Sequence, residues 1–176
     1  VATPMASSAP AVWLLGSSGY SAQVAGMLGL PFAFAHHFSA RNTVPALELY
    51  RSGFQPSAVL ERPYAMVTQS VIVADSHAEA ERQAKPGRLT QVALRTGRPR
   101  PLPRPDEAAA HEWTTAEREI LAAAPGRPTV GDPAEVVAEL TALVSATEAD
   151  ELMVTTMTYG IDARLRSFEL LAQAWA

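Results

Sequence analysis

The stretch Val12-Trp-Leu-Leu-Gly-Ser-Ser-Gly-Tyr-Ser21 decides the fold, because it joins an apolar run to a helix through a turn of small residues. The run Ala11–Gly16 is short, apolar and closed by glycine, which is typical of a buried parallel strand. Apolar residues at helical spacing follow over Ser21–Leu28, and Gly29 stands where helices commonly end. A strand that leads directly into a helix predicts a βα unit of a parallel sheet.

The turn of this unit has the chemistry of an anion site. Gly16 and Gly19 let the backbone turn tightly, and the new helix presents free N–H groups and the positive end of its dipole. Ser17, Ser18 and Ser21 add hydroxyl donors, so the turn suits a phosphate monoester. The alternative is that Ser18 or Ser21 only caps a helix after a small-residue turn. The residues alone leave both interpretations open.

The same turn excludes three better-known motifs. A Walker A loop requires Gly-Lys-Ser/Thr, and the only lysine of the chain is Lys85. The hydrolase nucleophile elbow requires Gly-x-Ser-x-Gly, but here Gly19 follows Ser18 directly. The dinucleotide fingerprint lacks its third glycine. The turn therefore predicts a phosphate site without a triphosphate or acyl-transfer signature.

Strands and helices continue to alternate along the chain. Further strands are expected at Pro31–His36, Tyr64–Ala74 and Glu151–Thr156, and helices at Thr43–Ser52, after the capping boxes Ser76–Glu79 and Thr114–Glu117, from Asp132 to Ser145, and at Ala163–Ala174. Four strands that alternate with helices predict a parallel α/β sheet, either open and doubly wound or part of a barrel. A complete (β/α)8 barrel needs about 250 residues. The chain would supply half of one.

The segment Pro86–Pro105 interrupts the pattern, since it holds five prolines, two glycines and no acidic residue. We expect loop or lid material there, within a Pro/Arg-rich region at about 86–113. The stretch Arg82–Arg104 carries seven of the fourteen basic residues, but it has no aromatic side chain on which a nucleic-acid base could stack. A solvated loop is the alternative to a lid.

The bulk composition favours a single domain and excludes several classes of protein. The 176 residues are 48% hydrophobic, which is enough for one core, and the net charge of −4 favours neither nucleic acid nor an anionic membrane as a partner. The absence of cysteine excludes a disulfide framework and a thiolate nucleophile. No membrane span is apparent, and Val1–Ser8 lacks the regions of a signal peptide, so we expect a cytoplasmic protein. A first residue that is Val rather than Met indicates missing residues upstream.

Six segments, taken in chain order, form a further pattern. They are Leu14–Ala22, Leu28–Phe38, Pro45–Arg51, Val130–Val136, Asp150–Thr156 and Arg164–Ala172. In this order they resemble the bacterial-luciferase-like, flavin-dependent monooxygenases. The resemblance covers nearly the whole chain, and its specificity lies in the series rather than in any single motif.

The resemblance implies that the four strands are the fifth to eighth of a (β/α)8 barrel, so that the chain is its C-terminal half. In the family, the loop after the fifth strand holds the phosphate of reduced flavin mononucleotide (FMN). That role falls on the hydroxyls of Ser17, Ser18 and Ser21 and on the backbone of Gly19 and Tyr20. A deazaflavin is the alternative cofactor.

The resemblance also places the His36–His37 pair near the flavin edge and the substrate, because the pair ends the second predicted strand. Packing at a strand end is the alternative role. No third ligand with suitable spacing accompanies the pair, so no metal site is expected. Thr155 and Thr156 end the last strand and either line the same mouth or are ordinary strand residues. The Pro/Arg-rich region corresponds to a mobile lid.

The activity implied by the resemblance is oxidation of an organic substrate by O2 with reduced FMN from a separate flavin reductase, and a homodimer is common in the family. No residue is a convincing general base, so none is named as catalytic. The alternatives are a deazaflavin-dependent oxidoreductase and a non-catalytic phosphate- or flavin-binding fragment that another chain completes. An unclosed sheet of this kind would expose apolar edges.

Overall fold

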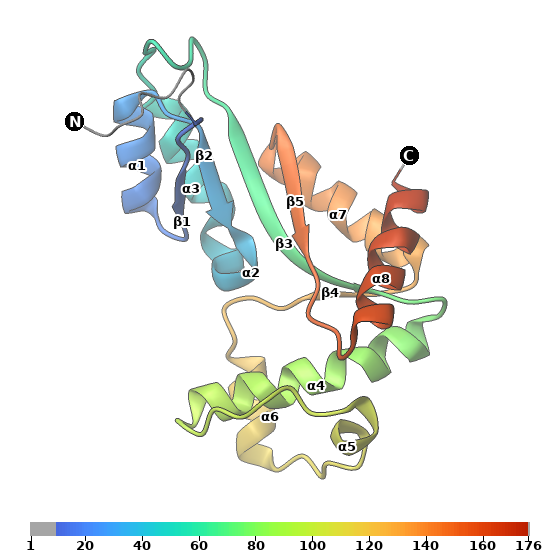
Figure 1. The fold of residues 1–176 in the computed structure, drawn as a ribbon. Coiled ribbons are helices and arrows are strands. Elements are labelled where there is room, and N and C mark those ends of the chain that lie inside the picture. The colour runs from blue at the N-terminus through green and yellow to red at the C-terminus, as the bar shows by residue number, and fades with distance from the viewer. Residues whose placement is uncertain (1–9, 176) are drawn as a thin grey trace, which may run out of the picture.

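The computed structural model describes residues 10–175 and consists of parallel strands connected by helices (Figure 1). The strands are β1 (Leu14–Gly16), β2 (Phe32–Ala35), β3 (Ala65–Val73), β4 (Thr129–Gly131) and β5 (Glu151–Thr155). The helices are α1 (Gly19–Leu28), α2 (His36–Ser39), a 3-10 turn (Ala40–Asn42), α3 (Thr43–Ser52), α4 (His77–Arg95), α5 (Pro105–Ala109), α6 (Thr115–Ala122), α7 (Pro133–Thr147) and α8 (Ile161–Ala174). The expectation about Val1–Ser8 falls outside the described residues.

The four strands expected from the sequence pair in the order β1–β2–β3–β5, and every pair is parallel. β2 pairs with Ala65–Thr68 and β5 with Met66–Ser70, so these two strands occupy opposite edges of β3. Within residues 10–175, the outer edges of β1 and β5 have no partner strand. The predicted parallel α/β sheet is therefore confirmed, and its open row of four strands is consistent with half of a (β/α)8 barrel.

A fifth strand, β4, was not predicted from the sequence. It pairs with Val71–Val73, the last three residues of β3. No strand was expected at Thr129–Gly131, because three residues are too few to show a strand period. β4 thus lies apart from the row of four strands and directly precedes α7.

Helix α4 shows that the loop predicted from Pro86 to Pro105 is partly wrong, since α4 continues through Pro86 to Arg95. A proline inside a helix removes a backbone hydrogen bond and usually ends the helix. Here Pro86 is buried together with Leu89 and Val92, and burial of this helix face offsets the lost bond. Only 96–104 and the turns around α5 lack regular structure in the expected lid region.

The outer face of the sheet carries the core. Phe32, Phe34 and Val67 pack against α1 and α3, whereas Val71 and Val73 pack against α7 and α8. Figure 1 shows the same division, with one helix pair beside β1 and β2 and the other beside β5. Because strand side chains alternate between faces, the residues between these core positions point to the opposite, inner face. No helix of the described residues is long and apolar enough to cross a membrane.

Candidate functional site

The loop predicted to bind phosphate and the histidine pair lie at the same end of the sheet. The loop Gly16–Ser21 follows β1, and the His36–His37 pair follows β2, which runs parallel to β1. The carboxyl ends of parallel strands meet at one edge, where α/β barrels bind their ligands. The structure thus brings the two predicted groups to one rim.

The loop after β1 leaves several of its polar groups available to a ligand. Ser18 is the N-cap residue of α1 and has an extended backbone, but its side chain makes no capping hydrogen bond. The Oγ atom of Ser21 donates to the backbone oxygen of Ser18 at 3.0 Å. The N–H groups of Gly19 and Tyr20 belong to the first helical turn and have no intrahelical acceptor. Neither serine therefore acts as a side-chain cap, which weakens the alternative that the loop only starts a helix.

The inner face of the sheet borders a cavity of about 540 Å³ next to this rim. Alternate residues of the four paired strands contribute its lining, namely Trp13, Leu15, Ala33, Ala35, Met66, Thr68, Met153 and Thr155, together with His37 and Phe38. Apolar side chains form most of the wall. Of the polar ones, His37 follows the end of β2, Thr155 ends β5, and Thr68 lies in β3 level with Ala35, the last residue of β2. Leu15 is 66% exposed and Met153 is 52% exposed, so this inner-face cavity is open to solvent.

His37 is the member of the histidine pair that lines the inner-face cavity. Its Nδ1 atom lies 3.1 Å from the backbone oxygen of Thr68 and 3.1 Å from the Thr68 hydroxyl. A carbonyl oxygen only accepts, so Nδ1 carries the hydrogen of the neutral ring and donates it. Nε2 then has the lone pair, and no hydrogen-bonding partner for it occurs in residues 10–175. His37 can therefore accept a hydrogen bond from a bound molecule.

His36 points away from this cavity. Its Nδ1 atom lies 2.8 Å from the hydroxyl of Thr43, and the ring lines a separate polar cavity that also includes Gln69 and Glu139. Burial lowers the pKa of His36 and the neighbouring His37 lowers it further, whereas Glu139 acts in the opposite direction. The pair was expected to end a strand, but it begins α2 instead. Adjacent residues of a helix point in different directions, so the two rings separate.

The threonines after β5 also separate. Thr155 lines the inner-face cavity, whereas the hydroxyl of Thr156 is buried and lacks a hydrogen-bonding partner among the described residues. Of the two roles considered for these threonines, Thr155 has the first, lining the cavity, whereas Thr156 does not line it.

A further cavity, of about 230 Å³, lies between α4 and the end of β3. It shares His37 and Phe38 with the inner-face cavity, and Ile72, Gly87 and Leu94 are among its other lining residues. This cavity was not predicted, because a loop was expected from Pro86 onward in place of the second half of α4. A helical period of apolar residues over Leu89, Val92 and Ala93 was the available signal.

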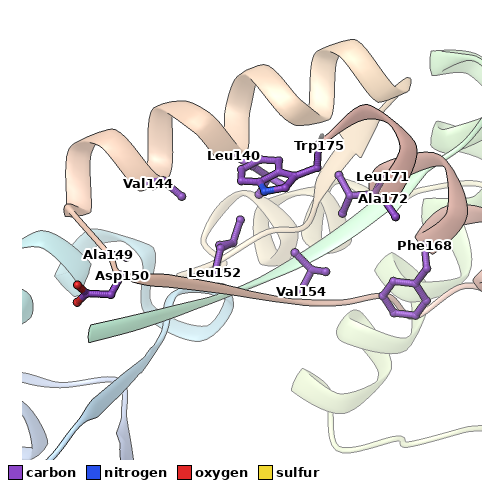
Figure 2. Close-up of a pocket in the computed structure, with 10 residues that line it drawn as sticks. All are labelled: Leu140, Val144, Ala149, Asp150, Leu152, Val154, Phe168, Leu171, Ala172 and Trp175. Carbon is purple, nitrogen blue, oxygen red and sulfur yellow. The ribbon is translucent and has the colours of Figure 1, made fainter. Parts of the chain in front are cut away.

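Another cavity, of about 450 Å³, lies on the outer face between α7, β5 and α8 (Figure 2). Figure 2 shows the Trp175 ring beside Leu140, and Leu152 and Val154 on the strand that forms the opposite wall. No residue of the loop after β1 or of the histidine pair lines it. Its lining is apolar except for Asp150, so it lacks the polar groups that orient a cofactor. Residues 10–175 contain no group of three or more side chains suited to hold a metal ion.

A row of parallel strands with a glycine turn and a cavity at its carboxyl rim is typical of the α/β barrel class of proteins. The sequence model of luciferase-like monooxygenases matches residues 1–150. The chain therefore belongs to the luciferase-like monooxygenase family, as the resemblance indicated.

The most informative relatives are similar along nearly the whole chain. A luciferase-like monooxygenase of Escherichia coli (strain K12) is 46% identical over 159 residues, which are 90% of this chain and 48% of that protein. The crystal structure of apo-MsnO8 has a TM-score of 0.89 at 35% identity and covers 98% of this chain and 53% of MsnO8. The oxygenating constituent of 3,6-diketocamphane monooxygenase from Pseudomonas putida has a TM-score of 0.63 at 23% identity, over 96% of this chain and 48% of that one. The chain spans about half the length of these proteins.

Proposed function

We propose that this chain supplies the cofactor-phosphate loop and part of the active-site wall of a flavin-dependent monooxygenase that oxidises an organic substrate with reduced FMN and O2. The loop Gly16–Ser21 is the observation that carries the proposal. It combines unpaired N–H groups of α1 with a Ser18 hydroxyl that is not used for capping. The 3,6-diketocamphane monooxygenase constituent is described in complex with FMN, which supports this choice of cofactor.

The residues of the site fit such a cofactor. The phosphate would accept hydrogen bonds from the N–H groups of Gly19 and Tyr20 and from the hydroxyls of Ser17 and Ser18, and from Ser21 once its hydroxyl turns from the Ser18 oxygen to the phosphate. The apolar inner face would exclude water from one side of the ring system, and His37 would accept a hydrogen bond at the rim. When bound, reduced FMN supplies the electrons for the reaction with O2.

Two further components belong to the proposal. A separate flavin reductase would deliver reduced FMN, and the region 96–113 would close over the mouth as a lid. The loop after β1 would hold the phosphate of a deazaflavin as well as that of FMN. Titrations with FMN and with a deazaflavin are therefore needed to distinguish an FMN-dependent monooxygenase from a deazaflavin-dependent oxidoreductase. One neighbouring fold, that of an F420-dependent secondary alcohol dehydrogenase, is described in complex with an F420-acetone adduct.

The second candidate is a flavin-binding piece without turnover of its own. It is favoured by the exposure of Leu15 and Met153 on the inner face and by the unpaired edges of β1 and β5 within the described residues. In that case, the polypeptide that corresponds to the N-terminal half of the relatives would cover the inner face and complete the catalytic site. Turnover that appears only when both parts are present supports this candidate.

The test is a fluorescence titration of the chain with FMN and, in parallel, with riboflavin, which lacks the phosphate. We expect FMN to bind more tightly than riboflavin. The double substitution Ser18→Ala/Ser21→Ala should weaken FMN binding by about tenfold or more, since a hydrogen bond to a charged group contributes about 1.5–3 kcal/mol. Riboflavin binding should change little. Ser52→Ala/Ser145→Ala is the matched control, because both serines are exposed and lie on α3 and α7. Equal affinity for FMN and riboflavin in every variant would contradict the phosphate loop.

A further inference from the structure

The cavity between α4 and β3, here called the distal cavity, continues the inner face beyond the rim of the sheet. β2 pairs with β3 only as far as Thr68, and β5 only as far as Ser70. β3 itself continues to Val73, so Ser70 extends the inner-face row past β2, and Ile72 extends it past both β2 and β5. α4 lies over these two residues and closes the distal cavity from outside the sheet.

The walls of the distal cavity are mostly apolar. Phe38, Ile72, Leu94 and Met157 contribute hydrocarbon or thioether surface. Two arginines also line it: the guanidinium of Arg88 makes two bonds of 2.7 Å with the carboxylate of Glu81, which compensates its charge, and Arg127 shares the lining of two neighbouring cavities with the carboxylate of Glu139. A cavity of about 150 Å³ holds benzene, so the 230 Å³ here can take a two-ring hydrocarbon.

One polar group stands where the distal cavity meets the inner-face cavity. His37 lines both, and its Nδ1–H is committed to Thr68 at 3.1 Å. The lone pair of Nε2 is therefore the acceptor offered at the junction. A molecule that occupies the distal cavity and reaches the junction gains a hydrogen bond there only if it carries a donor group.

We propose that the distal cavity is the substrate-specificity pocket of this site, and that it selects a largely apolar, uncharged molecule with one hydrogen-bond donor, such as a hydroxyl, directed at His37 Nε2. The inference rests on the proposed monooxygenase function, because it places the substrate between the loop after β1 and α4. It assigns to α4 a role in substrate selection that is separate from cofactor binding.

Gly87 offers a sharp test of this assignment. It lines the distal cavity from the middle of α4, and a Cβ atom built on it meets no atom within 4 Å. The Cβ atom of Gly87→Leu therefore has room, and we expect the rest of the leucine side chain to occupy the cavity. A glycine inside a helix costs about 1 kcal/mol relative to alanine, so this substitution should not lower the stability of the fold. Ala78→Leu is the matched control, because Ala78 is exposed on the same helix and outside the cavity lining.

The experiment measures binding of 2-naphthol to the 176-residue chain by its fluorescence, with 2-methoxynaphthalene as the ligand without a donor and 2-naphthoate as the anion. We expect saturable binding of 2-naphthol, binding of the methyl ether about three- to tenfold weaker, and the weakest binding for the anion. Gly87→Leu should weaken the binding of 2-naphthol at least tenfold, whereas Ala78→Leu should leave that affinity unchanged. His37→Phe should remove the preference for 2-naphthol over its methyl ether.

FMN titrations of the same variants separate this inference from the proposed function. Normal FMN binding with 2-naphthol affinity unchanged by Gly87→Leu overturns the specificity pocket and leaves the proposed function in place. Equal affinities for 2-naphthol and its methyl ether overturn the role of His37. Absence of FMN binding, with 2-naphthol bound and then lost in Gly87→Leu, overturns the proposed function but supports the ligand chemistry of the cavity.

Discussion

Gly16 and Ser21 lie so close together that a Cβ atom on Gly16 would stand 1.8 Å from the Oγ atom of Ser21. The Ser21 hydroxyl is held in place by its 3.0 Å hydrogen bond to the backbone oxygen of Ser18. A larger residue at position 16 would therefore displace the first turn of α1. The compact shape of the loop after β1 thus depends on a glycine at its first position.

We expect Gly16→Ala to lower the free energy of unfolding by about 1–3 kcal/mol, because an added methyl group forces a shift in a packed region. Urea denaturation followed by circular dichroism measures the change. Gly87→Ala is the control, since its Cβ meets open space and alanine favours the helix. Equal stabilities of Gly16→Ala and the unsubstituted chain would show that the loop relaxes without cost.

Glu148 ends α7 in the left-handed backbone region, with φ of 49°, and is the only non-glycine residue with positive φ in residues 10–175. We expect Glu148→Gly to raise the free energy of unfolding by about 1 kcal/mol, because glycine adopts this conformation without strain. Glu119→Gly on the exposed side of α6 should lower it by a similar amount. Thermal unfolding compares them, and a lower melting temperature for Glu148→Gly would contradict the expectation.

Asp150 joins the beginnings of β5 and β3 through two hydrogen bonds to one residue. Its carboxylate accepts from the N–H of Ala65 at 2.7 Å, and its own N–H donates to the Ala65 oxygen at 2.8 Å. Asp150→Ala should lower the free energy of unfolding by about 1.5–3 kcal/mol, because the buried N–H of Ala65 loses a charged acceptor. Asp150→Asn keeps an acceptor and should cost less. Urea unfolding of both variants checks the order, and equal losses would contradict it.

The His77–Glu135 pair should make stability depend on pH. The Nδ1 atom of His77 lies 2.9 Å from a carboxylate oxygen of Glu135, and the hydrogen bond and charge of Glu135 raise the pKa of His77 above 6.5. A raised pKa in the folded state means that the stabilisation is fully present below pH 6.5 and is lost as pH rises through the raised value. The pKa of Glu135 is lowered from 4.5, first by the N–H of Asp132 and then by His77, so its contribution is lost only in acid.

The measurement compares the unfolding free energy of the unsubstituted chain with that of His77→Gln at about pH 5.5 and about pH 9, in low salt. The difference should be larger at the lower pH and should shrink in high salt, because the pair is exposed. His36, whose lowered pKa acts in the opposite direction, is present in both proteins and cancels. A difference that grows with pH would contradict the assignment.

The open inner face should cause the isolated chain to self-associate. Leu15 and Met153 expose apolar surface next to unpaired strand edges of the described sheet. Sedimentation velocity should show association that increases with protein concentration and decreases in Leu15→Lys/Met153→Lys. The control Val59→Lys/Leu165→Lys removes exposed apolar residues from a loop and from α8. Equal behaviour of the two double variants would show that the inner face is not the contact surface.

Local signals in the sequence were sufficient for most elements. The capping boxes at Thr114 and Asp132 begin α6 and α7 as expected, and the run closed by Gly16 became β1 followed directly by α1. These signals work because a cap, a glycine turn or an apolar period depends on residues a few positions apart. The phosphate-type loop was predicted for the same reason, since all its groups lie between Gly16 and Ser21.

Only the tertiary structure decided features that depend on distant residues. α4 passes through Pro86 because its buried face packs beneath β3 and β4, and that burial offsets a lost backbone hydrogen bond. β4 exists because Val71–Val73 offers it a partner. His37 rather than His36 faces the cavity because the chain turns into α2 at that point and Thr68, thirty-one positions away, holds the ring. The sequence by itself determined most of the elements and the glycine turn after β1, and packing between distant segments determined β4, the length of α4 and the cavities.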